Sequence, residues 1–369
     1  MKKKVLLITP SLDRTGSEML LWYLINNLDP NKFELYVFSL RKGELYRQLP
    51  ERIGKSAAYK VGKWYHKAFR GLLKLFGAEP IAYQLKQIQK RFKADLWYAN
   101  TILIPQAPPV AKAVGVKMAT HFHEFMYAYG FIKSTAFKDI VEHSDALVGC
   151  SPLVCEKLKA LGHPNVLLQN SFIDAQKIKP DAQRVAGLRQ QHGLAETDFV
   201  WLISGSMAYM KGLDMVLVIA EHFKKQPVKI IWVGGDLHNG LDYYVKTVAA
   251  KQNCQNLIFT GAIAADYYNY FALANAYLSL SREECLSLAM LEAASLGKPI
   301  VSFDTGIAKT FVKEGMGLVV DGFNVADMIK AMEAFWQNPS HDAKLLKEAA
   351  AVYTVEQQLP NFEQLLANI

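Results

Sequence analysis

The chain has 369 residues, of which 51% are hydrophobic and 21% charged, a composition that excludes disordered and fibrous proteins and suffices for two globular domains. No apolar run approaches the roughly 18 residues of a membrane-spanning helix, and the four cysteines form no C-x-x-C pair. These features predict a reduced, cytoplasmic protein without a structural metal. The net charge of +8 is uneven, because residues 1–90 hold 17 Lys and Arg against 7 Asp and Glu, while the rest holds 25 against 27.

Short apolar runs alternate with helix-length segments through the first half of the chain. Six runs predict buried strands, at residues 5–9, 33–40, 96–99, 116–120, 146–150 and 166–169. Segments 19–28 and 81–92 predict helices between them. Because strands that alternate with helices pair in parallel through right-handed crossovers, residues 1–175 predict one doubly wound domain.

The same alternation starts again after a polar stretch at about residues 174–196. Six further strands are predicted, at residues 199–204, 228–233, 257–260, 276–280, 300–303 and 318–320. The predicted fold class is therefore α/β, with two Rossmann-like doubly wound domains, 1–175 and 176–350, facing each other across a ligand cleft.

A basic segment lies inside the first domain, where the chain has no acidic residue between Glu51 and Glu79. One face of a predicted helix carries Lys63, Lys67, Arg70 and Lys74, beside an apolar stripe of Trp64, Ala68, Leu72 and Leu75. Such a helix favours adsorption to an anionic membrane surface, where each basic residue contributes about 1 kcal/mol. An ordinary surface helix, with its apolar side packed on its own domain, explains the pattern equally well. No nucleic-acid-binding motif accompanies the charge.

Two histidines follow the predicted strand 116–120. Alternation places His121 and His123 on the same side of an extended segment, at the carboxyl end of a strand. A pair of hydrogen-bonded structural histidines and a functional pair both fit this pattern. A metal site is disfavoured, because no third ligand occurs at a suitable spacing.

The second domain opens with a strand, a loop that carries Lys211, and a helix predicted to begin near Leu213. An ammonium group above the carboxyl end of a strand, close to a helix N-terminus, is well placed to bind a diphosphate. A surface lysine without a function is the alternative. Glycines also end two later strands, at Gly234, Gly235 and Gly261, where the backbone is able to approach a ligand closely.

Residues 277–303 read as a strand, an acidic loop, a helix from 286 to 296, and the next strand. Gly297 and Pro299 end the helix, and its N-terminus points to the carboxyl edge of the sheet, where a phosphate is favoured. Glu292 is suited to accept hydrogen bonds from two adjacent hydroxyls, such as those of a ribose, and Glu284 to do the same for a second polyol. Taken alone, two glutamates at this spacing are most often solvated helix positions.

The whole run resembles the E-x7-E segment of the family 4 (group 1) glycosyltransferases, retaining enzymes of the GT-B fold that use nucleotide-sugar donors. The resemblance implies that Glu292 holds the nucleotide ribose and Glu284 contacts the donor sugar. It also implies that the backbone amides of Leu286, Ser287 and Leu288 bind the leaving diphosphate.

A second segment resembles the G-R-x-x-x-x-K-G loop of this family, from Gly205 to Gly212. The resemblance implies that Lys211 binds the diphosphate. Ser206 stands where the family has Arg, so Lys211 is the remaining cation of the loop. By the same resemblance Gly234 and Gly235 line the nucleotide site and Gly261 borders the base pocket.

Three further segments resemble family motifs. Residues 15–19 resemble the G-G-x-E turn and keep Gly16, whose backbone approaches the donor phosphate or the acceptor in relatives. Residues 121–125 resemble the H-x-H-E segment, which implies that His123 faces the donor sugar and Glu124 orients it or assists the acceptor. Residues 304–311 align with the G-G-x-x-E loop, but Ile307 and Thr310 replace its second Gly and its Glu.

The resemblance implies a retaining, metal-independent glycosyltransferase. Its donor is a UDP- or GDP-linked nucleotide-sugar, with no other cofactor, and its acceptor is a glycan or lipid-linked glycan of bacterial envelope assembly. A cytoplasmic site on the inner face of the membrane follows, with the helix at 351–369 packing toward the N-terminal domain. The departures at Ser206, Ile307 and Thr310 leave two alternatives, a catalytically weak or inactive binding subunit and a nucleotide-sugar epimerase.

Overall fold

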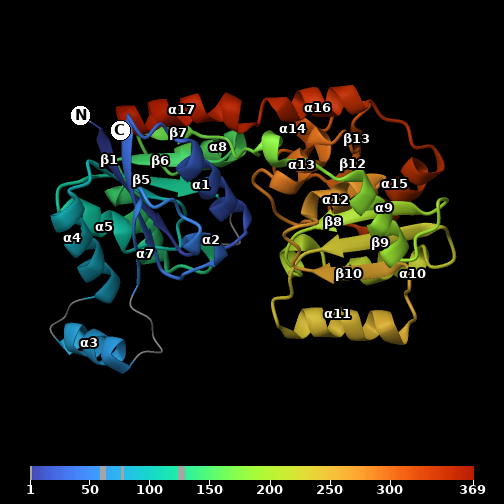
Figure 1. Cartoon of the computed structure of the whole chain (residues 1–369), viewed down its shortest axis with the longest axis horizontal. Helices are drawn as coiled ribbons and strands as arrows, with labels where there is room; N and C mark the ends of the chain where they lie inside the picture. Colours follow the sequence, from blue (N-terminus) through green and yellow to red (C-terminus); the bar gives the residue numbers. More distant parts are fainter. Residues whose placement is uncertain (1, 59–63, 76–78, 124–128) are drawn as a thin grey trace. The chain divides into compact units, whose positions relative to one another are not determined.

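The computed structural model describes residues 2–58, 64–75, 79–123 and 129–369. The chain divides into two compact units (Figure 1). Unit 1 comprises Met1–Ser171 together with Val355–Ile369, and unit 2 comprises Phe172–Thr354. The sequence predicted these boundaries near residues 175 and 350. None of the described helices is long and apolar enough to cross a lipid bilayer.

A seven-stranded parallel sheet forms the centre of unit 1, with strand order β3-β2-β1-β4-β5-β6-β7. The strands are β1 (Lys3–Thr9), β2 (Phe33–Ser39), β3 (Gly54–Ala57), β4 (Leu96–Ala99), β5 (Lys117–Phe122), β6 (Ala146–Gly149) and β7 (Val166–Leu168). The helices are α1 (Gly16–Asn27), α2 (Glu44–Arg47), α3 (Trp64–Leu75), α4 (Pro80–Phe92), α5 (Ala107–Ala113), α7 (Ser134–His143), α8 (Pro152–Ala160) and α17 (Val355–Asn368).

Central strands of this sheet are apolar on both faces, as helices on both sides of a parallel sheet require. Val5, Leu6, Leu7 and Ile8 of β1 are all fully buried. Ile8 is in register with Phe38 of β2 and Ala99 of β4. The sequence predicted six of the seven strands and missed β3, because this short edge strand, GKSA, carries no apolar run.

The C-terminal helix α17 belongs to unit 1, where it lies against α1 (Figure 1). Phe362 and Leu366 are fully buried, and the ring of Phe362 meets the ring of Tyr98 edge-on at 5.2 Å. An ion pair of 2.6 Å joins Lys32 to Glu363. The last residues of the chain therefore complete the core formed by its first 171.

A six-stranded parallel sheet forms the centre of unit 2, with strand order β10-β9-β8-β11-β12-β13. The strands are β8 (Phe199–Ser204), β9 (Val228–Val233), β10 (Leu257–Gly261), β11 (Ala276–Ser279), β12 (Ile300–Phe303) and β13 (Gly317–Val320). The helices are α9 (Ala182–Gln191), α10 (Val216–His222), α11 (Gly240–Lys251), α12 (Tyr267–Leu273), α13 (Leu288–Ser295), α14 (Ala308–Phe311), α15 (Val325–Gln337) and α16 (Ala343–Ala351).

The two doubly wound α/β units confirm the predicted fold class. The polar stretch at about residues 174–196, for which the sequence predicted no helix or strand, contains α9. Asp181 caps this helix by accepting hydrogen bonds from the backbone N–H groups of Gln183 and Arg184. In α9 the one buried residue is Leu188. A helix that buries so few side chains lacks the repeated apolar positions by which a helix is predicted from sequence.

Phe362→Ala should lower the free energy of unfolding by about 3–5 kcal/mol, because it removes a fully buried ring and leaves a cavity between α17 and the sheet. Equilibrium urea unfolding measures the change. Phe131→Ala is the control in the same unit, since the Phe131 side chain is 67% exposed, and should cost within about 0.5 kcal/mol. Equal losses from the two variants would show that α17 contributes little to the core.

Candidate functional site

Loops at the carboxyl edge of the second sheet touch one another through their backbones. A Cβ atom added to Gly234 would lie 1.7 Å from the carbonyl oxygen of Gly205. That oxygen also accepts a hydrogen bond of 2.9 Å from the indole N–H of Trp232, which is fully buried. Gly234 donates its own N–H to the Gly261 oxygen at 3.0 Å. Glycine at 234 therefore lets the loops after β8, β9 and β10 meet.

Lys211 and Glu284 form an ion pair across this edge, and Ser281 donates its hydroxyl to Glu284 Oε1 at 2.9 Å. We call these three residues the Lys211 cluster. The Lys211 side chain is 31% exposed and that of Glu284 is 14% exposed. An ammonium and a carboxylate thus face the solvent-accessible end of the sheet from two different loops, β8–α10 and β11–α13.

The sequence predicted Lys211 at the start of a helix, and this prediction is wrong. Lys211 ends a 3₁₀ turn, Tyr209–Lys211, and α10 begins at Val216 instead of near Leu213. Gly212 ends the turn with φ at 77°, and a Cβ atom there would lie 2.4 Å from the Leu280 carbonyl oxygen. The close contact with the β11–α13 loop therefore sets the loop conformation.

The helix that carries Glu292 also begins later than predicted. Ser287 is the N-cap of α13, and its hydroxyl accepts a hydrogen bond of 3.3 Å from the N–H of Met290. Leu286 and Ser287 precede the helix and Leu288 is its first residue, so the expected row of three helical amides is wrong. The first turn of an α-helix still leaves N–H groups without an intrahelical partner at this edge.

Glu292 lies in the second turn of α13 and is buried. Its two oxygens accept hydrogen bonds from the hydroxyls of Tyr267, at 2.9 Å, and Tyr268, at 3.3 Å. The Tyr267 hydroxyl is also 2.8 Å from Ser204 Oγ of β8. We call these four residues the Glu292 network. Burial raises the pKa of Glu292 to about 7, against the opposing effect of the two tyrosine hydrogen bonds.

The departures from the family motifs have simple local contacts. Ser206 is exposed and its backbone carbonyl accepts the N–H of Ala208 at 2.7 Å. Ile307 is buried, and the Thr310 hydroxyl donates to the Ile307 carbonyl at 2.9 Å within the same turn. This loop reaches the backbone of Glu284 through Gly306, where a Cβ atom would lie 2.6 Å from the Glu284 backbone carbonyl oxygen.

A polar cluster lies at the carboxyl edge of the first sheet. The rings of His121 and His123 are 3.8 Å apart, which places both side chains together as the alternation predicted. Tyr98 OH is 2.6 Å from His121 Nδ1, and His123 Nε2 is 3.2 Å from Asn100 Oδ1. Burial lowers the pKa of His123 to about 3 and holds the pKa of His121 well below its ordinary value. Both imidazoles are therefore neutral at physiological pH. Glu124 lies outside the described residues.

The same cluster reaches the N-terminus of α1, whose first residue is Gly16. Asn100 donates from Nδ2 to the Ser17 carbonyl at 2.8 Å, so one amide side chain connects α1 with His123. Next to this contact, Ser11 donates its hydroxyl to the buried carboxylate of Glu18. Burial raises the pKa of Glu18.

Lys67, Arg70 and Lys74 of the basic segment lie in α3, which contacts α4, and Lys63 lies outside the described residues. Lys67 is exposed and Arg70 is half-buried. Leu72 and Leu75 of the predicted apolar stripe are 49% and 84% exposed. Leu73 is the buried leucine of the helix instead. The alternative in which this stripe packs on its own domain is therefore wrong for Leu72 and Leu75.

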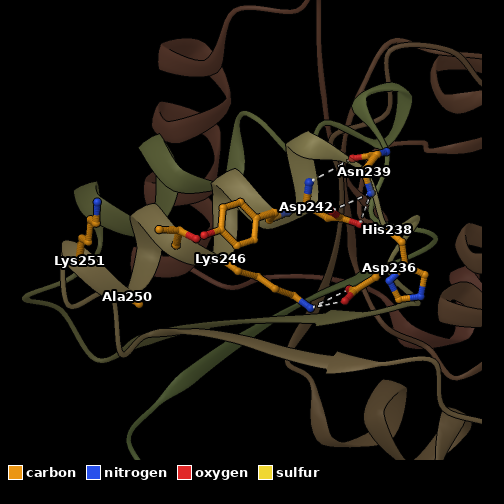
Figure 2. A pocket seen from close by; sticks show the side chains of 9 residues that line it. Asp236, His238, Asn239, Asp242, Lys246, Ala250 and Lys251 are labelled. Carbon is orange, nitrogen blue, oxygen red and sulfur yellow. Dashed lines mark hydrogen bonds and ion pairs between the residues drawn. The ribbon is translucent and has the colours of Figure 1, made fainter.

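A separate open groove of 710 Å³ follows α11 in unit 2 (Figure 2). Lys246 extends toward Asp236 and forms an ion pair of 2.6 Å with it. Asp242 accepts backbone hydrogen bonds at the start of the helix, which lower its pKa in spite of the opposing effect of desolvation. No residue of the Lys211 cluster or the Glu292 network lines this groove. Across the described parts of the chain, no three His, Cys, Asp or Glu side chains are grouped as metal ligands.

Comparisons with known proteins relate unit 2 to a known family. The family model for "Glycosyl transferases group 1" matches residues 186–352, which contain both clusters of unit 2. The alpha-galactosylglucosyldiacylglycerol synthase of Streptococcus pneumoniae is 30% identical over 223 residues, covering 58% of this chain and 57% of that protein. The O-antigen chain mannosyltransferase C of Escherichia coli is 28% identical over 171 residues, covering 45% and 43%. The chain thus matches about half the length of these relatives.

Crystal structures support the fold along the whole chain. Anabaena Alr3699/HepE, in complex with UDP and glucose, superimposes with a TM-score of 0.83 at 17% identity, covering 100% of both chains. WaaG, a glycosyltransferase involved in lipopolysaccharide biosynthesis, gives a TM-score of 0.72 at 12% identity, covering 99% of this chain and 100% of that chain. Residues 186–352 therefore match the group 1 glycosyltransferase family, and the chain has the fold of the GT-B glycosyltransferase structures.

Glu292 should make stability depend on pH. Because its folded-state pKa is about 7, above the ordinary value of 4.5, the folded protein binds this proton more tightly than the unfolded chain. The resulting stabilisation is fully present below pH 4.5 and is lost as the pH rises to about 7. The free energy of unfolding of the wild type, relative to Glu292→Gln, should therefore fall by about 3 kcal/mol from about pH 4 to pH 8.

Chemical denaturation of both proteins across this range measures the difference, and groups common to both cancel. A constant difference would show that Glu292 keeps an ordinary pKa in the folded state.

Proposed function

We propose that the chain is a retaining, metal-independent glycosyltransferase that moves a sugar from a UDP- or GDP-linked donor to a glycan or lipid-linked acceptor. Unit 2 binds the donor and unit 1 binds the acceptor. The observation that carries the proposal is the Lys211 cluster, a cation and a carboxylate held at the carboxyl edge of a parallel sheet within the segment that matches the family. Ligands of open α/β sheets bind at this edge.

The Glu292 network suits a ribose. Both carboxylate oxygens already accept a hydrogen bond from a hydroxyl, which is the interaction that two adjacent ribose hydroxyls provide. The bond from Tyr268 is the longer, at 3.3 Å against 2.9 Å from Tyr267, so it is the one a ribose hydroxyl replaces at lower cost. Nucleotide binding would then leave Tyr267 in place between Glu292 and Ser204.

Lys211 supplies the charge that the reaction needs. As the anomeric C–O bond breaks, negative charge develops on the departing diphosphate, and a fixed ammonium stabilises it. Glu284 contacts the donor sugar and holds Lys211 through their ion pair. The acceptor hydroxyl attacks the anomeric carbon on the face from which the diphosphate leaves, and its proton passes to that phosphate. His123 remains neutral, so it contributes a hydrogen bond and no charge.

Relatives support the substrate class. Their names include a galactosylglucosyldiacylglycerol synthase and an O-antigen chain mannosyltransferase, that is, a glycolipid and a glycan chain as products. HepE has been crystallised with UDP and with UDP-glucose, which favours the UDP series. The exposed Ser206 and the internally bonded Thr310 favour the alternative of a weak or inactive binding subunit.

Lys211→Ala should lower the turnover of sugar transfer by a factor of about 10²–10³, because the diphosphate loses the one cation of its loop. A coupled assay for nucleoside diphosphate release, run with chelator present, measures the rate, and NMR of the product reports the anomeric configuration. Lys246→Ala, which breaks an ion pair outside the site, is the control and should keep wild-type turnover. Transfer by Lys211→Ala at the wild-type rate would remove Lys211 from the mechanism, and no transfer by the wild type would favour the inactive subunit.

We also propose that α3 binds an anionic membrane surface on which a lipid-linked acceptor is presented. Its exposed Leu72 and Leu75 offer apolar surface, and Lys67 is exposed beside them. Apolar insertion and attraction to anionic lipid act together on such a helix.

Replacing Lys63, Lys67, Arg70 and Lys74 by Gln should abolish sedimentation with vesicles of anionic phospholipid, since about 1 kcal/mol is lost at each position. The control replaces four exposed basic residues elsewhere in unit 1, Lys86, Lys90, Arg91 and Lys112, which leaves the same net charge. Equal binding by the two variants would make the attraction a property of net charge and not of α3.

A further inference from the structure

Arg282 connects the two loops that carry the Lys211 cluster. Its guanidinium donates to both carboxylate oxygens of Asp214, from Nη1 to Oδ1 at 2.8 Å and from Nη2 to Oδ2 at 2.7 Å. Nη1 also donates to the Tyr209 carbonyl at 2.6 Å, and the guanidinium carbon lies 3.9 Å from the centroid of the Tyr209 ring. The backbone N–H of Arg282 donates to the Met210 carbonyl at 2.9 Å.

These contacts bracket Lys211 along the chain. Tyr209 and Met210 precede it, Asp214 follows it, and Arg282 itself is two residues from Glu284. A three-residue 3₁₀ turn has little internal stability, so contacts with the neighbouring loop decide where its side chains lie. A planar guanidinium in a two-pronged bond with a carboxylate fixes distance and orientation together. The Arg282 side chain is only 17% exposed, which distinguishes it from a solvated surface pair.

Arg282 also removes a competing partner for Lys211. Asp214 lies three residues after Lys211 in the same loop, and its carboxylate would attract the ammonium if it were unpaired. With both of its oxygens bonded to Arg282, Asp214 leaves Lys211 to Glu284. Because Ser206 provides no cation, Lys211 is the one basic residue between Gly205 and Gly212. Its position therefore determines the charge that this loop presents.

We infer that Arg282 and Asp214 form a positioning pair that holds Lys211 at the site of the donor diphosphate. The inference rests on the proposed function for its catalytic consequence. Its structural part is that the pair orders the Lys211 loop. This part concerns the protein without any ligand. Neither residue touches the donor, so both act through Lys211.

Arg282→Lys keeps the positive charge and removes the two-pronged bond and the stacking on Tyr209. Asp214→Asn is the milder second variant, because it keeps one acceptor oxygen. In both, turnover should fall on the order of 10-fold to 100-fold, as expected for a displaced catalytic group, while the KM for the donor changes less. The double variant with Lys211→Ala and Arg282→Lys should lose no more turnover than Lys211→Ala alone, since the two residues act as one unit.

Arg184→Lys is the matched control. Arg184 makes the same two-pronged bond, to Asp266 at 2.8 and 2.7 Å, in unit 2 but in neither loop of the Lys211 cluster. It should keep wild-type turnover. A melting temperature of Arg282→Lys close to that of this control separates a positioning role from a loss of global stability.

Hydrogen–deuterium exchange of the free proteins decides the structural part without any substrate. Residues 206–214 should exchange faster in Arg282→Lys and Asp214→Asn than in the wild type or Arg184→Lys, with β8 and β9 unchanged. The inference would be overturned by unchanged exchange of residues 206–214, or by losses of turnover that add up in the double variant with Lys211→Ala. A wild type that transfers no sugar would contradict the proposed function instead, and the exchange data would still decide whether the pair orders the loop.

Discussion

Backbone atoms of neighbouring loops touch along the carboxyl edge of the second sheet, and the arrangement of the whole candidate site depends on these contacts. Gly234 lies against the Gly205 carbonyl, Gly212 against that of Leu280, and Gly306 against that of Glu284. At each point a side chain would collide with main-chain atoms that have little room to move. Adjacent parallel strands end at the same edge, so the glycines allow successive loops to lie one on another.

This packing explains how groups far apart in the sequence come into register. The Lys211 loop touches the Glu284 loop at Gly212, and the loop after β12 touches the same segment at Gly306. The ion pair of Lys211 with Glu284 then forms between loops already in contact. Its charges are held before a ligand arrives, which lowers the reorganisation needed when negative charge develops on a bound phosphate.

The two units differ in how they present polar groups. Unit 2 holds a partly exposed ion pair and, on the helix that follows Glu284, a buried carboxyl whose pKa is near neutrality. Unit 1 gathers neutral groups, with His121 and His123 kept uncharged by burial and connected to α1 through Asn100. The charged groups of unit 2 suit a phosphate-bearing donor, and the neutral groups of unit 1 suit the hydroxyls of an acceptor.

Much of the fold was predictable, because buried parallel strands such as β1, β8 and β12 are continuous apolar runs bounded by turn residues. Edge strand β3 and helix α9 were missed, since one is polar and the other buries little besides Leu188. Motif spacing predicted that Lys211 and Glu284 are site residues, and the structure joins the two in one ion pair. Motif spacing did not indicate Tyr267, Tyr268 or Arg282. Hydrogen bonds such as that of Arg282 to Asp214, 68 residues apart, depend on side-chain directions that periodicity does not encode.

The most direct test of the account is a thermal-shift panel of UDP, GDP, ADP and their common sugar conjugates on the whole chain, with chelator present. A ligand at about 100 times its Kd stabilises the folded state by about 2.7 kcal/mol, enough for a clear rise in melting temperature. The account predicts such a rise with one nucleotide series, and its loss in Glu292→Ala. No rise with any nucleotide, or an equal rise in Glu292→Ala, would contradict a donor site built on α13.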